Sequence, residues 1–164
     1  MEIGLVSDLH DHLPEWDKIN QKLKDLKIDR VLFMGDTCSP IAAVHMAKTF
    51  PGKIDHIFGN VDGDPFLTAQ KTAEFKNFTL HGREAEVEIT DKKIFMVHYP
   101  INAEHAAATS KYDYVFFGHN HEKSEETIGD TKIVNPGTAG GVMQLPTFAV
   151  IDLLSGETTF YDVK

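Results

Sequence analysis

Acidic residues and histidines follow the apolar segments of this sequence, and both are residue types that bind metal ions. The first place is near the N-terminus, where a short apolar run of Ile3, Leu5 and Val6 is followed by Asp8 and His10. A spacing of two residues in a tight turn after a strand lets both side chains converge on one point, as the ligands of a divalent cation do. One Asp-x-His pair taken alone is more often a solvated turn than a metal site, so the interpretation depends on whether the arrangement recurs.

The arrangement recurs four more times along the chain. Further apolar runs end in acidic, amide or imidazole side chains at Asp36, at Asn60, at His98, and at the pair His119 and His121. These seven residues supply more oxygen and nitrogen donors than one metal ion needs, and they suit two ions with a carboxylate able to bridge them. Two divalent ions about 3.5–4 Å apart can hold a phosphoryl group between them. The pattern therefore predicts a two-metal site.

Each of these residues also has an ordinary structural interpretation. Asp36 and Asn60 are common turn residues, and a lone His98 at a strand end is typical of a hydrogen-bonded polar group. The single cysteine, Cys38, is expected to be a small buried hydrophobe and not a ligand. The remaining histidines are expected to play no part in the chemistry: His12, His45, His56, His81 and His105. The joint occurrence of the seven residues in one order favours the metal site.

The elements that position these residues alternate in type in the first half of the chain. Strands are predicted over residues 3–6, 30–34 and 54–58, with amphipathic helices over 14–27 and from Pro40 to about Pro51. The strand–helix–strand order implies parallel strands with right-handed connections, which places Asp36 beside Asp8 and His10. Residues 63–77 are expected to form a loop and a short helix.

The second half is predicted to be mostly β-structure, with one Ala-rich helix over 103–110. An antiparallel hairpin is expected from strands 84–89 and 94–97, and a second hairpin turns at Gly129 and Asp130. The other strands are expected over residues 114–117, 125–128, 132–134, 147–154 and 158–161. Among the strands of this half, 94–97 and 114–117 end at the histidines described above.

Composition limits the class of protein. The chain has 164 residues, which suits one domain over residues 1–164, and its 41% hydrophobic and 25% charged residues are ordinary for a soluble globular protein. We expect a cytoplasmic location, because we see no leader or membrane span and because one cysteine cannot form an internal disulfide. The net charge of −9 has the wrong sign for a protein that coats nucleic acid, so no long nucleic acid is expected as a partner.

Six segments together resemble a known family. In chain order they read SDLHDH, FMGDT, FGNVDGD, VHYP, FFGHNH and VNPGT. They resemble the motifs of the calcineurin-like metallophosphoesterases, and in particular the small single-domain bacterial and archaeal phosphodiesterases. The resemblance extends from Met1 to about Leu154. It implies an α/β fold, a four-layer α-β-β-α sandwich of two mixed β-sheets flanked by helices.

The resemblance also implies roles for the seven residues. Asp8, His10 and His121 would bind one metal ion, Asn60, His98 and His119 the other, and Asp36 would bridge the two. In the family's proposed mechanism a hydroxide that bridges the metals attacks phosphorus in line, so Asp36 and Asn60 become catalytic as well as metal-binding residues. We expect two divalent ions, manganese first, with nickel, iron, magnesium or zinc as alternatives.

Two departures from the family pattern leave details open. Larger relatives have a His after the motif Asn, whereas this chain has Val61 and then Asp62. The candidates for protonating the leaving group are therefore Asp62, Asp11 and water. In addition, His98 is followed by Tyr99 and Pro100 where small relatives often have Gly. The pocket walls are expected from residues 63–77, 99–102 and 144–147.

The function we predict is hydrolysis of small phosphodiesters by a metal-dependent enzyme. The alternative is a non-catalytic protein-interaction scaffold, because the fold also resembles the phosphoesterase-like subunit of eukaryotic retromer. The complete set of seven candidate ligands favours catalysis over the scaffold. The natural substrate and the oligomeric state stay open, and a homo-oligomer formed through an exposed apolar patch is one possibility.

Overall fold

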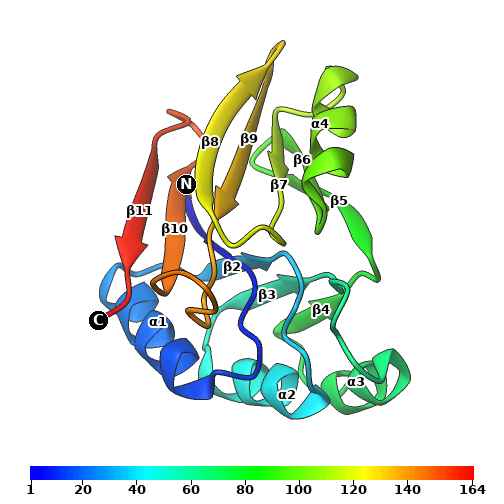
Figure 1. Ribbon diagram of the computed structural model, residues 1–164, viewed down its shortest axis with the longest axis vertical. Coiled ribbons are helices and arrows are strands. Elements are labelled where there is room, and N and C mark those ends of the chain that lie inside the picture. Colours follow the sequence, from blue (N-terminus) through cyan, green and yellow to red (C-terminus); the bar gives the residue numbers. More distant parts are fainter.

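Two β-sheets pack face to face, and helices cover the outer face of each (Figure 1). The computed structural model describes residues 1–164. The first sheet contains, in spatial order, β11 (Thr158–Asp162), β10 (Thr147–Asp152), β1 (Glu2–Val6), β2 (Arg30–Phe33), β3 (Lys53–His56) and β4 (Phe78–Leu80). The second contains β5 (Glu84–Ile89), β6 (Lys92–Val97), β7 (Tyr114–Phe116), β9 (Thr131–Pro136) and β8 (Lys123–Ile128).

Both sheets are mixed, as expected from the sequence. Strands β1 to β4 run parallel to one another, and β10 and β11 complete that sheet in antiparallel orientation. In the second sheet β6, β7 and β9 are parallel, while β5 and β8 pair antiparallel at the two edges. The parallel strands matter most here, because they direct their carboxyl ends to one side of the molecule.

The layers follow from the two-residue period of side chains along buried strands. In β2 and the residue after it, Leu32 and Met34 enter the core between the sheets, whereas Val31 and Phe33 face the helices. The same alternation places residues of β7 in the central core and in the contact with α4. Strands buried on both faces read as continuous apolar runs, which is why their sequences are VLFM and YVFF.

Helices α1 (Leu13–Asp25), α2 (Pro40–Thr49) and α3 (Pro65–Thr72) lie on the side of the first sheet, and α4 (Pro100–Ala108) lies against the second sheet (Figure 1). Trp16, Ile19 and Leu23 of α1 are fully buried on the sheet. Ser39 caps α2, since its Oγ accepts a hydrogen bond from the Ala42 N–H. The expected four-layer α-β-β-α sandwich is confirmed.

Two elements differ from the sequence-based expectation. Strand β4 was not predicted, because three residues are too few to show an alternating pattern and the strand is defined by its pairing with β3. Helix α4 begins at Pro100, three residues before the predicted start, because proline is favourable in a first helical turn. Residues 100–102 are therefore helical and not loop. None of the helices has the length and apolar character that a membrane span requires.

Candidate metal centre

The seven candidate ligands lie where the carboxyl ends of parallel strands from the two sheets meet. Asp8 and His10 follow β1, Asp36 follows β2 and Asn60 follows β3, all in the first sheet. His98 follows β6, and His119 and His121 follow β7, in the second sheet. The side beyond the carboxyl ends of parallel strands is the usual position of binding sites in α/β proteins.

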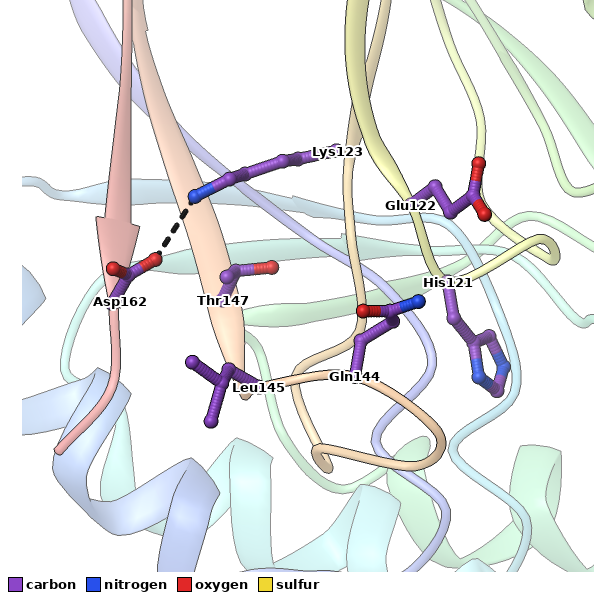
Figure 2. Close-up of a pocket in the computed structure, with 7 residues that line it drawn as sticks. All are labelled: His121, Glu122, Lys123, Gln144, Leu145, Thr147 and Asp162. Carbon is purple, nitrogen blue, oxygen red and sulfur yellow. Dashed lines mark hydrogen bonds and ion pairs between the residues drawn. The ribbon is translucent and has the colours of Figure 1, made fainter.

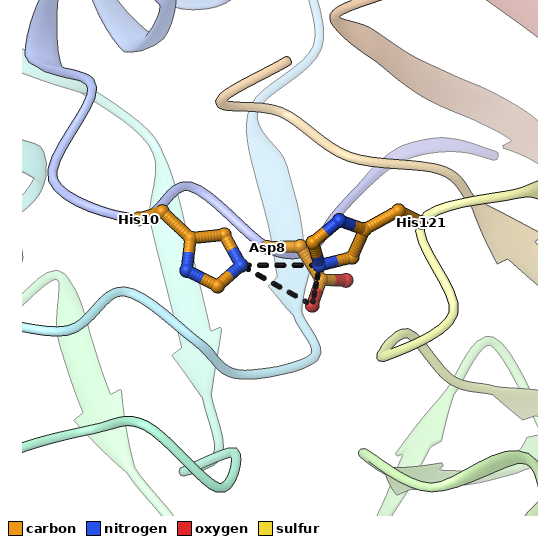
Figure 3. A group of neighbouring side chains, drawn as sticks. All are labelled: Asp8, His10 and His121. Atoms are coloured by element: carbon orange, nitrogen blue, oxygen red, sulfur yellow. Dashed lines mark hydrogen bonds and ion pairs between the residues drawn. The ribbon is translucent and has the colours of Figure 1, made fainter. Parts of the chain in front are cut away.

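Asp8, His10 and His121 form the first donor group, with one donor atom from each within 4.8 Å of the others. Their side chains converge from two separate loops (Figure 3). The Nε2 atoms of the two histidines are 3.1 Å apart, and Oδ1 of Asp8 lies 3.4 Å from Nε2 of His121 and 4.0 Å from Nε2 of His10. One carboxylate oxygen and two imidazole nitrogens thus face a common point.

Asp36, His98 and His119 form the second donor group, again within 4.8 Å. Asn60 belongs to the same cluster, because its Oδ1 lies 3.0 Å from Nε2 of His98 and 2.9 Å from Nδ1 of His119. The structure therefore brings together all seven residues predicted from the sequence. Their role as metal ligands stays a prediction.

Backbone N–H groups hold both carboxylates, and one oxygen of each also faces the imidazoles; for Asp8 this is Oδ1, which lies 3.3 Å from the His119 nitrogen as well. Oδ2 of Asp8 accepts a hydrogen bond from the His119 N–H at 3.0 Å, and Oδ1 of Asp36 accepts one from the Val61 N–H at 3.0 Å. The remaining oxygen of Asp36, Oδ2, lies 3.3 Å from His98 Nε2 and 4.0 Å from His10 Nε2. Asp36 is thus placed between the two groups, as a bridging ligand requires.

In His98 and His121 a backbone carbonyl binds one imidazole nitrogen, which leaves the other nitrogen available for a metal ion. Nδ1–H of His98 donates to the Met34 carbonyl at 2.7 Å, and Nδ1–H of His121 donates to the Val142 carbonyl at 2.9 Å. In the neutral rings both Nε2 atoms then carry a lone pair that faces other acceptors, an arrangement that a proton or a cation must neutralise. A carbonyl that holds the outer imidazole nitrogen is also the usual support of a metal-binding histidine. The donors therefore fit divalent cations of the type that mixed oxygen and nitrogen sites hold.

The pKa shifts reflect the same crowding of charge. Burial lowers the pKa of His98, but the hydrogen bond to Asp36 and the nearby Asp8 outweigh this effect and raise it. For Asp36 burial raises the pKa, and the His98 hydrogen bond together with the Val61 N–H lowers it overall. The hydrogen bond to Asp8 raises the pKa of His121, whereas burial lowers that of His10. A negative carboxylate at Asp36 therefore persists to low pH and attracts a cation.

Five of the seven residues have a left-handed backbone conformation, with φ between 49° and 77°: Asp8, His10, Asp36, His119 and His121. This conformation is uncommon for residues other than glycine, although Asp, Asn and His adopt it more readily than most. It is a form of local strain that occurs at functional sites. The tight turns explain how a single short loop presents two side chains to one point.

Three glycines that precede candidate ligands have a role that the sequence analysis did not recognise. A Cβ atom on Gly59 would overlap with Oδ1 of Asp36, and a Cβ on Gly118 would overlap with Ser7 and approach Oδ2 of Asp8 to 2.6 Å. A Cβ on Gly35 would overlap with the backbone of Gly59. The signal for them was present as the repeated Gly-Asp, Gly-Asn and Gly-His pairs. Each glycine lets one loop of the centre approach another.

Asp62, a candidate for the leaving-group acid, is engaged by backbone N–H groups. Its Oδ2 accepts from the N–H of Asp36 at 2.9 Å and of Gly59 at 2.6 Å, and its Oδ1 accepts from the Cys38 N–H at 2.8 Å. These contacts favour a different role, in which Asp62 anchors the Asp36 loop to the Asn60 loop. Asp11, the other side-chain candidate, accepts hydrogen bonds from the N–H and hydroxyl of Ser39 through one oxygen, Oδ1.

Cys38 lies in neither donor group. Its Sγ lies 3.6 Å from Nδ1 of His10, on the ring edge away from the donor group, and burial raises the pKa of its thiol to about 12. His56 and His81 also lie outside the groups, since His56 bonds to the Thr37 hydroxyl at 2.6 Å and His81 to Asp55 at 2.8 Å. The two histidines thus have ordinary polar partners.

Comparisons with known proteins identify the family of the chain. The model of the calcineurin-like phosphoesterase superfamily domain matches residues 1–156. A phosphodiesterase of Methanocaldococcus jannaschii is 30% identical over 155 residues, which cover 93% of each chain. The solved structure of an archaeal phosphodiesterase superposes with a TM-score of 0.91 at 28% identity and 99% coverage of both chains.

A second solved structure shares the fold at greater distance. Vps29 of Entamoeba histolytica, solved in complex with zinc, superposes with a TM-score of 0.68 at 18% identity, over 99% of this chain and 91% of that one. At this identity the match concerns the fold alone. The family match over nearly the whole chain and the identity with the M. jannaschii protein go further: this chain belongs to the calcineurin-like phosphoesterase superfamily.

Proposed function

We propose that the protein hydrolyses small phosphodiesters with the help of two divalent metal ions. The observation that carries this proposal is the position of Asp36, whose Oδ2 lies between the imidazoles of His98 and His10. The phosphodiesterase activity named for the M. jannaschii relative supports the reaction class. The net charge of −9 supports a small substrate over a nucleic-acid polymer.

The proposed ligand assignment follows the two donor groups. Asp8, His10 and His121 would hold one ion, and His98, His119 and Oδ1 of Asn60 would hold the other. Asp36 would contribute to both. The hydrogen bonds that fix the imidazoles of His98 and His121 support this assignment, because they leave Nε2 free for a metal.

When bound, the two ions would supply Lewis-acid polarisation of the phosphoryl group and a more acidic water molecule. The residues of the chain position the reactants. Asn60 is exposed and can direct its Nδ2–H at a phosphoryl oxygen while its Oδ1 faces the histidines. In the reaction a bond forms between water oxygen and phosphorus, and the bond from phosphorus to the leaving oxygen breaks in line. The attacking water gives up one proton to solvent, and the leaving oxygen takes up one. The backbone N–H contacts to both oxygens of Asp62 disfavour that residue as the proton donor and leave Asp11 and water as the candidates.

The proposal also covers the metal, the location and the extent of the domain. Manganese is our first choice, with nickel, iron, magnesium or zinc as alternatives, since mixed oxygen and imidazole donors do not select sharply. A cytoplasmic location is supported by the one free cysteine, which fits a reducing compartment. We treat residues 1–164 as one domain, because both sheets contribute to one central core.

The experiment that tests the function is hydrolysis of bis(p-nitrophenyl) phosphate, a diester, beside p-nitrophenyl phosphate, a monoester. The protein is stripped of metal and each candidate ion is restored in turn. We expect metal-dependent turnover with preference for the diester. A folded protein that binds metal but hydrolyses neither compound would contradict the proposal and favour the scaffold alternative.

A further inference from the structure

A cavity of about 380 Å³ adjoins the metal centre. Of the seven candidate ligands, only His121 lines it. This volume is within the range of small-molecule sites, roughly 300–1,000 Å³. Figure 2 shows its other walls, which come from the start of β8, the loop before β10 and the end of β11. The lining includes Lys123, Gln144, Leu145, Thr147 and Asp162, with Glu122 at the edge near His121.

One loop, residues 137–146, connects this cavity to the metal centre. The Gly140 N–H donates to the carbonyl of Asp8 at 3.0 Å, and the Val142 carbonyl accepts the Nδ1–H of His121 at 2.9 Å. The same loop continues into Gln144 and Leu145, which line the cavity and are exposed. The wall of the cavity and the support of two candidate ligands are therefore one segment.

The charges in the cavity disfavour a second anionic group in the bound molecule. Its charged side chains are Glu122, Lys123 and Asp162, and Lys123 Nζ pairs with Asp162 Oδ1 at 3.0 Å (Figure 2). The charges of Lys123 and Asp162 neutralise each other, so the carboxylate of Glu122 gives the cavity a net charge of one negative unit. This net charge favours an uncharged group over a further phosphate or carboxylate.

The polar atoms suit hydroxyl groups instead. The carboxylates of Asp162 and Glu122 can accept hydrogen bonds, the Lys123 ammonium and the Gln144 amide can donate them, and only Leu145 is apolar. Thr147 is buried, and its hydroxyl already donates to the Pro136 carbonyl, so it forms the floor and not a recognition group. A ring of donors and acceptors with one apolar contact is typical of recognition of an uncharged polyhydroxy group.

We propose that this cavity binds an uncharged, hydroxylated substituent of the phosphodiester, such as a sugar unit, while the phosphoryl group lies at the metal centre. This inference rests on the proposed function and narrows its substrate class. Asp162 lies beyond residue 156, where the match to the family model ends. The cavity is therefore built in part by residues that the family match does not include.

The test compares two esters that share a leaving group. Bis(p-nitrophenyl) phosphate and the p-nitrophenyl ester of thymidine 5′-phosphate both release nitrophenolate, and they differ only in the second substituent. Gln144→Ala and Lys123→Met each remove one donor. We expect kcat/KM for the thymidine ester to fall roughly five- to tenfold more than kcat/KM for the aryl diester, mainly through KM.

The matched control is Lys92→Met. Lys92 forms a similar ion pair with Asp113, at 3.1 Å, outside the cavity, and its loss should leave the ratio of the two kcat/KM values unchanged. An unchanged ratio in Gln144→Ala and Lys123→Met would overturn the inference. So would a preferential loss on p-nitrophenylphosphorylcholine, whose substituent is cationic.

A binding measurement separates failure of this inference from failure of the proposed function. Titration calorimetry of the metal-loaded protein compares thymidine 5′-phosphate with inorganic phosphate and needs no turnover. We expect tighter binding of the nucleotide, with the difference lost in Gln144→Ala. Equal affinities in the wild-type protein would overturn the sugar site even if the enzyme hydrolyses diesters.

Discussion

The Oδ2 atom of Asp36 lies 3.3 Å from Nε2 of His98, while Oδ1 of the same carboxylate accepts the Val61 N–H. One oxygen therefore holds the side chain in the Asn60 loop, and the other faces the imidazoles of both donor groups. The two oxygens of this carboxylate therefore have different roles, and a substitution can remove one role and keep the other.

Asp36→Asn should abolish most of the diesterase activity and leave the fold intact. The amide oxygen can still accept the Val61 N–H, but an amide NH2 in place of Oδ2 cannot bind a cation. We expect kcat to fall at least about a hundredfold, which corresponds to roughly 2.7 kcal/mol of lost transition-state stabilisation. Asp17→Asn, at an exposed position paired with His45, is the control and should retain full activity. Equal activity of the two variants would contradict the bridging role.

Gly59→Ala should weaken metal binding, because the added methyl group would overlap with Oδ1 of Asp36. Gly63→Ala is a matched control in the same loop. Its Cβ would meet no atom closer than the Cys38 carbonyl at 3.6 Å, and its φ is not in the left-handed region. In a metal titration, Gly59→Ala should bind metal at least about tenfold more weakly than the wild-type protein, and Gly63→Ala should bind it normally. The reason is that the added methyl group displaces the Asp36 side chain, and such a change near a ligand lowers metal affinity. A similar affinity in both variants would show that the close approach at Gly59 is unimportant.

The variant Asp62→Asn distinguishes two roles of Asp62, which are anchoring the Asp36 and Asn60 loops and protonating the leaving group. If Asp62 anchors the two loops through its three N–H contacts, the variant should lose activity by a similar factor on diesters with good and poor leaving groups. Parallel assays on nitrophenyl and alkyl esters measure this. A loss confined to the alkyl esters would restore Asp62 as the leaving-group acid, because nitrophenolate leaves without protonation.

His56 should make the stability of the protein depend on pH. The ring is fully buried, stacked on Phe33 with ring centroids 5.0 Å apart, and burial lowers its pKa to about 4. Since the unfolded chain has a histidine pKa near 6.5, the unfolded state binds the proton first. The stabilisation is complete above pH 6.5 and is lost as the pH falls towards 4, by on the order of 3 kcal/mol.

Urea unfolding of the wild-type protein and of His56→Gln at pH 7.5 and 5.0 checks this prediction. The difference in unfolding free energy between the two pH values should be smaller in the variant. A glutamine retains a polar partner for the Thr37 hydroxyl, so the comparison isolates the titration of the ring. The same pH dependence in both proteins would exclude His56 as its source.

The sequence was sufficient to predict that these seven residues lie together, because each follows an apolar strand and parallel strands end on one side of a sheet. It was also sufficient for most elements, since two-sided burial and helical spacing leave clear patterns. The contacts across loops could not be predicted in this way. The fit of Gly59 against Asp36, the three N–H donors on Asp62 and the pairing that defines β4 all depend on segments far apart in the chain.

The measurement that tests the account most directly is titration of the metal-free protein with manganese while diester hydrolysis is followed. Two donor groups joined by Asp36 predict that activity rises until two equivalents are bound per chain and that Asp36→Asn removes it. Full activity at one equivalent would contradict the two-metal site. Two bound equivalents without turnover of any phosphodiester would contradict the enzymatic function itself.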